Sequence, residues 1–268
     1  MIELSRSQVD DLRQLLQFCA ELDAELVIIG AIAYQIHFPE DARHTSDIDL
    51  AVALDLDDFE DLTERLGQAG WTQTESREHR WRAAYGTLLD LIPAGEGLRR
   101  AKQIIWPKSQ FTMSLVGFDH VFSDSKAVTL AEDLAVRVIP PPVLMLMKIV
   151  AFLDDQYGRQ KDLSDIRALM SRYAAESERL FSDTAVAAGL DFTLANASLL
   201  GADMDALCSE EERDVVRRFV EAVRDESKPA WLAFVNAAPP GSLGRNEQTA
   251  LAQLQTFSES FGRSRQRA

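Results

Sequence analysis

An apolar run that ends at a glycine, followed by two aspartates one residue apart, constrains this chain most. Residues 27–29 are Val-Ile-Ile, and Gly30 and Ala31 follow directly, so the pattern predicts a buried strand that turns at once into a helix. Asp47 and Asp49 lie in the next apolar run, and alternation along a strand places both carboxylates on one face. A tight turn from strand to helix presents backbone N–H groups that suit a phosphate.

The two carboxylates predict a metal ion. Side by side they repel each other, and a hard divalent cation removes the conflict. Mg²⁺ prefers a few carboxylates together with substrate phosphates. Asp90 interrupts a further apolar run, residues 85–92, where aspartate is rare and costly to bury without a partner. We therefore expect Asp47, Asp49 and Asp90 to share a metal beside Gly30, in a site for nucleoside triphosphates.

Each half of this pattern has an ordinary alternative. An isolated Asp-x-Asp pair is commonly solvated or caps a turn, and an isolated Gly-Ala pair is commonly a turn before a helix. The order and separation of the two halves, with Ile48 and Leu50 beside the aspartates, favour the functional interpretation.

Composition limits the classes of protein that remain. The 268 residues are 46% apolar and 26% charged, which is typical of a globular protein with one large domain or two modest ones. The longest apolar stretch, residues 143–152, contains Lys148 and is too short for a bilayer, and the N-terminus lacks an apolar signal region. We therefore expect a cytoplasmic protein without a membrane partner. Cys19 and Cys208 are expected to be reduced packing residues.

The charge of the chain bears on its partners. A formal net charge of −15 disfavours a protein that grips a long nucleic-acid backbone, since such proteins carry a basic face. It favours a small cationic or protein acceptor over an extended duplex.

Two regions of different character follow one another. The first predicts an α/β (α+β) unit with a mixed sheet. After Pro140-Pro141-Pro142 the pattern is helical almost to the end. Strands are expected at residues 26–29, 47–54, 72–74, 81–85, 85–92, 111–116, 121–122, 128–130 and 134–139. Helices are expected at residues 8–21, 32–37, 57–69, 143–152, 163–173, 176–188, 192–199, 210–224, 229–235 and 247–261.

A second group of charged residues lies in the helical region. Lys148 interrupts an apolar helix, and lysine is seldom buried without a partner. It either extends to solvent or neutralises charge that develops during phosphoryl transfer. Residues 159–166, which include Lys161 and Asp162, begin the next helix, where Asp162 could cap it or orient a nearby cation.

Taken together, these motifs resemble one known family. Gly30-Ala31, residues 43–50, Asp90, Lys148 and residues 161–165 resemble the ordered motifs of the AbiEii-type nucleotidyltransferases. That family belongs to the polymerase-β-like superfamily and includes toxins of type IV toxin–antitoxin systems. The resemblance covers roughly residues 25–170 and is weak over the last hundred.

The resemblance implies a fold and a set of site residues, and the change of pattern at the three prolines gives the division into domains. A nucleotidyltransferase domain would occupy residues 1–139, and a helical C-terminal domain completing the nucleotide cleft would occupy residues 140–268. Asp47 and Asp49 would bind Mg²⁺, and Lys148 and Asp162 would belong to the catalytic site; Asp90, which the apolar run already led us to expect at the metal, completes the catalytic and metal-binding set. Nucleotide binding would involve Gly30, Ala31, Thr45, Ser46, Lys148 and Lys161.

The implied reaction moves a nucleoside monophosphate from an NTP to an acceptor hydroxyl. The acceptor would be RNA such as a tRNA end, a protein or a small molecule such as an antibiotic, and a cognate antitoxin protein is a possible partner. The superfamily turn usually reads Gly-Gly or Gly-Ser, so Ala31 lacks a hydroxyl for the phosphate. This departure keeps open a degenerate module that binds nucleotide without turnover.

One basic stretch offers a candidate surface for an RNA acceptor. It contains Trp81 as a possible stacking group, although a solvated turn is the simpler interpretation. Its cations are Arg77, Arg80, Arg82, Arg99, Arg100 and Lys102.

Overall fold

The computed structural model describes residues 4–40, 45, 47–74, 77–174, 178–181, 192–237 and 247–262. The chain divides into two compact units, residues 1–144 and 145–268, which are described one at a time. The division falls inside helix α6 (Pro141–Asp154), just after the boundary that the sequence predicted at residue 139.

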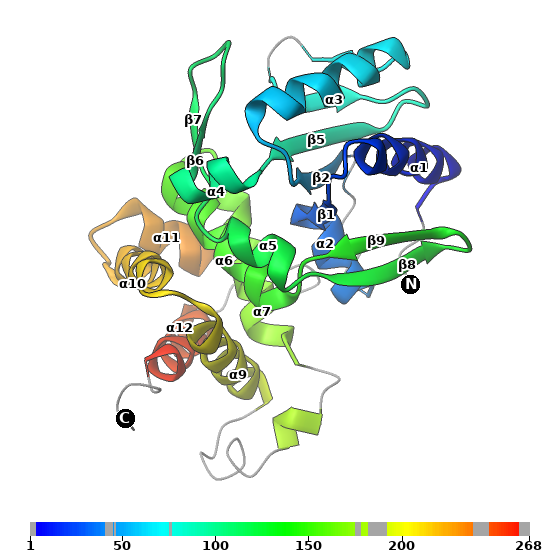
Figure 1. Cartoon of the computed structure of the whole chain (residues 1–268). Coiled ribbons are helices and arrows are strands. Elements are labelled where there is room, and N and C mark those ends of the chain that lie inside the picture. The colour runs from blue at the N-terminus through cyan, green and yellow to red at the C-terminus, as the bar shows by residue number, and fades with distance from the viewer. Residues whose placement is uncertain are drawn as a thin grey trace. The chain divides into compact units, whose positions relative to one another are not determined.

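A seven-stranded mixed sheet forms the first unit, with strands in the order β3-β4-β5-β2-β1-β9-β8 (Figure 1). The pairs β2/β5 and β1/β9 are parallel, and the others are antiparallel, which confirms the predicted mixed sheet. The strands are β1 (Leu26–Ile29), β2 (Asp47–Val52), β3 (Thr72–Gln73), β4 (Arg80–Arg82), β5 (Leu88–Pro93), β8 (Lys126–Ala131) and β9 (Leu134–Val138). A second sheet pairs β6 (Gln103–Ile105) with β7 (Thr112–Ser114).

Five described helices accompany the sheet of this unit. They are α1 (Arg6–Glu21), α2 (Gly30–His37), α3 (Leu56–Gln68), α4 (Glu96–Ala101) and α5 (Phe118–Ser123). Ser5 caps α1 by accepting the Gln8 N–H, and the Gln8 side chain accepts the Ser5 N–H in return. Apolar residues at helical spacing, such as Leu12 and Leu15 of α1, are fully buried.

Strand β5 begins later than the sequence predicted. The buried Asp11 of α1 accepts hydrogen bonds from the backbone N–H groups of Tyr85 (3.0 Å) and Thr87 (3.1 Å). Gly86 between them has φ +96°, a left-handed conformation that suits glycine. Residues 85–87 therefore belong to the turn between β4 and β5, which spans residues 83–87.

A predicted strand at residues 121–122 is wrong. Both residues lie in α5, which follows Gly117 in the left-handed region (φ 87°). Phe118, Val121 and Phe122 are buried at i, i+3 and i+4, which is helical rather than alternating spacing. The two-residue apolar run was too short to show its period.

Helices make up the described part of the second unit, as predicted. They are the rest of α6, α7 (Gln160–Arg172), a 3₁₀ turn (Glu178–Phe181), α9 (Phe192–Leu207), α10 (Glu210–Arg224), α11 (Pro229–Asn236) and α12 (Glu247–Phe261). Of the helix expected at residues 176–188, only residues 178–181 are described, and they form the 3₁₀ turn. Phe219 packs edge-to-face against Phe152 and Phe234, with ring centroids 5.9 and 6.3 Å apart.

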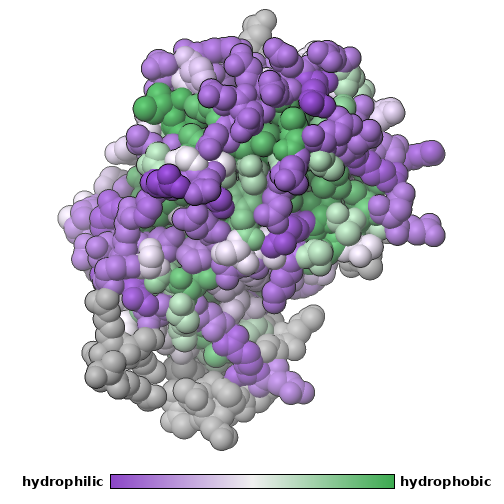
Figure 2. Space-filling model, viewed as in Figure 1, coloured by the Kyte–Doolittle hydropathy of each residue, from purple (hydrophilic) through white to green (hydrophobic). Residues whose placement is uncertain are grey.

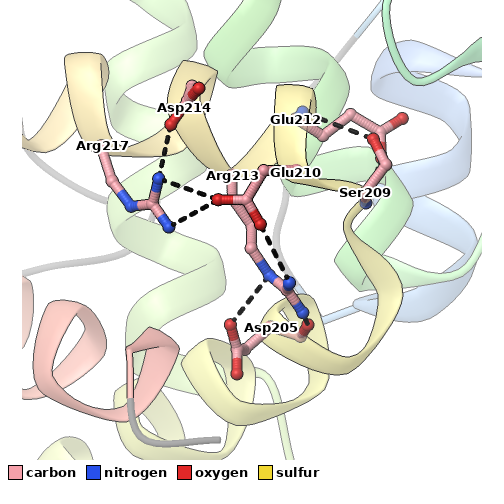
Figure 3. A network of polar contacts seen from close by, with 7 residues as sticks. All are labelled: Asp205, Ser209, Glu210, Glu212, Arg213, Asp214 and Arg217. Atoms are coloured by element: carbon pink, nitrogen blue, oxygen red, sulfur yellow. Dashed lines mark hydrogen bonds and ion pairs between the residues drawn. The ribbon is translucent and has the colours of Figure 1, made fainter. Parts of the chain in front are cut away.

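Polar contacts fix the start of α10 (Figure 3). Ser209 accepts the Glu212 N–H, and the Glu212 side chain accepts the Ser209 N–H at 2.7 Å. Arg213 lies 3.1 Å from Asp205 at the end of α9 and 3.6 Å from Glu210. The reciprocal cap explains why the helix begins at the residue that the sequence predicted.

The surface is largely hydrophilic in the view of Figure 2, where hydrophobic residues form separate patches. No helix of the described residues is long and apolar enough to cross a membrane.

Cys19 and Cys208 are free and buried, which confirms their expected role in packing. Burial raises the pKa of the Cys19 thiol to about 12.

Close packing of α9 on α12 gives a test of the second unit. A Cβ at position 201 would overlap the backbone carbonyl oxygen of Phe257, which cannot move as a flexible side chain would. We expect Gly201→Ala to lower the free energy of unfolding by about 1–3 kcal/mol, as overpacking does. Gly67→Ala is the control, because nothing lies within 4 Å of its added Cβ, and it should be neutral or slightly stabilising. Urea unfolding measures both, and an equally stable Gly201→Ala protein would contradict this packing.

Candidate functional site

Strand β2 places Asp47 and Asp49 on the same face of the first unit's sheet. Ile48 and Leu50 are fully buried, whereas the two aspartates are only half-buried, as the alternation predicted. Asp49 is opposite Ile29 in the β1/β2 register and opposite Asp90 in the β2/β5 register. The three central strands thus bring all three predicted carboxylates to one region.

Gly30 lies directly against Asp49. Its φ is +66°, and an added Cβ would lie 2.7 Å from Asp49 Cγ and overlap the carboxylate oxygen Oδ2. Both the backbone conformation and this approach require glycine here. Helix α2 begins at Gly30, and its N-cap Ile29 supplies no side-chain hydrogen bond. The carboxylates therefore lie beside a helix N-terminus, which is a favourable position for phosphate.

The segment before β2 is described only in part. Thr45 Oγ1 donates to Asp47 Oδ1 at 2.8 Å, so Thr45 orients a predicted metal ligand. Ser46, also predicted to contact the nucleotide, lies outside the described residues, as do Arg43 and His44.

Asp90 has an ion-pair partner that the sequence interpretation missed. Arg80 Nε donates to Asp90 Oδ1, and Arg80 Nη2 donates to Asp90 Oδ2, both at 2.7 Å. The same Nη2 also donates to Asp47 Oδ2 at 2.7 Å. These contacts, above all the hydrogen bond with Asp90, raise the pKa of the Arg80 guanidinium above its usual value. Gly86 indicates a hairpin turn in the sequence, but it does not fix the register, in which Arg82 is opposite Leu88 and Arg80 is opposite Asp90.

The carboxylates of this site fit a magnesium ion that takes few of its ligands from the protein. Among the residues that the structure describes, no three His, Cys, Asp or Glu side chains are grouped closely enough to hold a metal ion. Asp47 and Asp49 supply hard oxygen ligands on one face, next to a backbone that no Cβ obstructs. Mg²⁺ commonly takes one or two carboxylates and completes its shell with water and phosphates. Asp90 as a third ligand remains a prediction.

In the second unit, Lys148 lies among buried carboxylates. Its Nζ is 2.7 Å from Asp162 Oδ1 and 2.8 Å from Asp165 Oδ2. Its side chain is 11% exposed, and those of the two aspartates are 1% and 0% exposed. The alternative in which Lys148 extends to solvent is therefore wrong. Asp165 was not singled out from the sequence, although Asp162 and Asp165 at i and i+3 share a face of α7.

Lys161 and Arg159 are more accessible than Lys148. Lys161 is exposed, and Arg159, with 45% of its side chain exposed, has its Nε 3.7 Å from Asp162 Oδ2.

The basic stretch does not form the stacking surface that the sequence suggested. Trp81 is only 5% exposed, because it faces inward on β4. Arg80 pairs with Asp47 and Asp90, and Arg100 pairs with Glu96. Arg99 lies 3.6 Å from Asp119 and 4.8 Å from the centre of the Phe122 ring.

This combination of a mixed sheet, a glycine turn and paired aspartates defines the nucleotidyltransferase class. The chain belongs to the family described as nucleotidyl transferase AbiEii toxin, type IV toxin–antitoxin system, whose model matches residues 13–237. The family assignment made from the motifs is thereby confirmed, over a longer stretch than the motifs span. A search of curated proteins gave no significant match.

Solved structures show more distant likenesses. The antibiotic-resistance factor ANT(2'')-Ia is 15% identical, with 84% of this chain and 98% of that chain covered and a TM-score of 0.40. An antigenic nucleotidyltransferase-like protein from Paracoccidioides brasiliensis is 16% identical, with coverage of 89% and 96% and a TM-score of 0.39. JHP933 from Helicobacter pylori is 10% identical, with coverage of 99% and 97% and a TM-score of 0.37. The assignment rests on the family match and not on these likenesses.

The ion pairs of Lys148 change what its replacement should do. On sequence alone, Lys148→Met removes only a charge at a modest packing cost. In the structure it would leave Asp162 and Asp165 buried beside each other without their cation. We expect a loss of roughly 3–5 kcal/mol in the free energy of unfolding, as for other broken buried pairs.

The exposed Lys161→Met is the control, and it should change stability by less than about 0.5 kcal/mol. Adding Asp165→Asn to Lys148→Met should restore part of the loss, because one of the two uncompensated charges is removed. Chemical denaturation of the four proteins, with the wild type as reference, measures these effects. A Lys148→Met protein as stable as wild type would mean that the buried ion pairs do not form in solution.

Proposed function

We propose that this protein is a Mg²⁺-dependent nucleotidyltransferase that moves a nucleoside monophosphate from an NTP to an acceptor hydroxyl. The observation that carries the proposal is the close approach of Asp49 to Gly30, with Asp47 on the same face of β2. Two carboxylates beside a helix N-terminus provide oxygen ligands for a cation and N–H groups for the phosphates bound to it. Family membership supports the same reaction class.

The reaction balances without a further co-reactant. The acceptor oxygen forms a bond to the α-phosphorus of the NTP, and the bond from that phosphorus to the bridging oxygen breaks to release pyrophosphate. Asp47 and Asp49 would hold Mg²⁺, which when bound neutralises phosphate charge. Asp90 would complete the metal site or accept the proton of the acceptor hydroxyl.

Further residues enter the proposal through the family resemblance. Gly30, Ala31, Thr45 and Ser46 would lie at the phosphates. Lys148 and Lys161 would contact the nucleotide, and Asp162 would hold Lys148 in place. The 2.7 Å contact between Lys148 and Asp162 supports this last role.

For the acceptor we propose a chemical class of molecule. Membership in a toxin family supports a growth-inhibiting role, with a cellular RNA or protein as acceptor and a cognate antitoxin as partner. The net charge of −15 and the pairing of Arg80 with Asp47 and Asp90 favour a protein or a small cationic acceptor.

Labelling with NTPs tests the reaction. Wild-type protein incubated with α-phosphate-labelled NTPs, Mg²⁺ and a cell lysate should label an acceptor, whose size and sensitivity to nuclease or protease identify its class. The Asp47→Asn/Asp49→Asn protein should label it at least on the order of 100-fold more slowly, since charge stabilisation at the phosphates is lost. Asp58→Asn, an exposed carboxylate in the first turn of α3, is the control and should be unchanged. Equal labelling by the double variant would refute the proposal.

Ala31 favours a second candidate, a module that binds nucleotide without turnover. A ligand that binds only the native state stabilises it, so NTP with Mg²⁺ should raise the melting temperature under either candidate. Labelling of an acceptor distinguishes the transferase from the module. A protein stabilised by neither NTP nor metal would count against both.

Replacing Ala31 by serine tests the phosphate cradle itself. The added hydroxyl at the start of α2 can donate to a phosphate oxygen, so Ala31→Ser should enlarge the NTP-dependent rise in melting temperature. Ala33→Ser places the same hydroxyl at a fully buried position in the same helix and should not enlarge it. An unchanged shift in Ala31→Ser would place the phosphates away from this turn.

A further inference from the structure

One cation lies between two of the aspartates assigned to the site. Arg80 is paired with Asp90 across β4 and β5, and Asp90 is paired with Asp49 across β5 and β2. Paired residues point to the same face of a sheet, and Asp47 lies two residues before Asp49 on that face. Among the described residues of three adjacent strands, this face therefore brings Asp47, Asp49 and Asp90 together with Arg80, and the exposed Arg82 lies further along it; β5 and β2 are labelled in Figure 1.

The guanidinium of Arg80 makes its strongest contacts with this group. It binds both oxygens of Asp90 and one oxygen of Asp47, all at 2.7 Å. The side chains of Arg80 and Asp90 are 22% and 10% exposed, so water competes weakly for these bonds. Bidentate pairs of this type are among the stronger hydrogen-bonded contacts in proteins.

A divalent metal would need the same oxygens. A metal shared by Asp47 and Asp90 would have to take a position that the guanidinium now holds, or one beside it against the repulsion of a fixed positive charge. We infer that Arg80 is a positioning residue that competes with divalent metal for Asp47 and Asp90, and this inference rests on the proposed function. Arg80 thereby keeps metal affinity low in the absence of nucleotide.

The triphosphate explains how the competition is resolved. It brings phosphate oxygens that complete the shell of a metal held by Asp47 and Asp49, and anionic groups to which a guanidinium can also bind. Metal and nucleotide binding are then coupled through Arg80, and linkage requires that each strengthens the other by the same factor. A residue that only stabilised the sheet would leave this coupling unchanged.

Strand β4 offers a matched control. Arg82 lies two residues further along the same face and is exposed, and its Nη1 donates to the Gly86 carbonyl oxygen at 3.5 Å. Replacing Arg82 by glutamine removes the same charge from the same strand and leaves the contacts of Asp47 and Asp90 in place.

The experiment measures binding of Mn²⁺ to the full-length protein by electron paramagnetic resonance, without nucleotide and with a non-hydrolysable NTP analogue. Without nucleotide, Arg80→Gln should bind Mn²⁺ on the order of five- to tenfold more tightly than wild type, because one nearby positive charge is gone. Arg82→Gln should match wild type within about twofold. The gain in Mn²⁺ affinity on adding the analogue should be smaller in Arg80→Gln than in wild type.

Arg80→Lys provides a second variant if Arg80→Gln does not fold. An ammonium keeps the charge but cannot make the bidentate contact, so its Mn²⁺ affinity should lie between those of wild type and Arg80→Gln. Mn²⁺ affinities equal to wild type in the folded Arg80 variants, or an equal increase in Arg82→Gln, would overturn the inference. Failure of the proposed function is seen separately, as the absence of labelled acceptor with wild-type protein.

Discussion

The close approach of the Asp49 carboxylate to the backbone at Gly30 is the contact on which the proposed site depends. It exists because β1 and β2 are antiparallel neighbours, so the end of β1 lies opposite the start of β2. Any side chain at position 30 would meet the carboxylate, and the φ of +66° would strain it as well. The turn from β1 to α2 and the acidic strand β2 therefore pack directly against each other, and a shift of one requires a shift of the other.

Each of the two units contains a cation that contacts two carboxylates. In the first unit a guanidinium joins Asp47 to Asp90, and in the second an ammonium joins Asp162 to Asp165. A half-buried or buried carboxylate is costly without a partner, so each cluster supplies its own cation. The difference is geometric, because the planar guanidinium binds in a fork and the ammonium acts as a point charge.

Family membership and the local chemistry point to the same reaction class from independent directions. The family model covers most of the chain, whereas the site argument uses only a few residues on three strands and one helix. Ala31 and the buried Trp81 are features that depart from what the motifs suggested. Both concern what the site binds, and neither alters the fold.

The sequence by itself determined the mixed sheet, the change to helices after the three prolines, and the shared face of Asp47 and Asp49. These follow from local periodicity and spacing, which act over a few residues. Only the tertiary structure decided which cation pairs with Asp47 and Asp90, and which with Asp162 and Asp165. Arg80, predicted as part of an open basic surface, lies opposite Asp90 because of strand register, and Lys148 lies against two aspartates of the next helix. Register and helix packing depend on the whole core, so no local pattern specifies them.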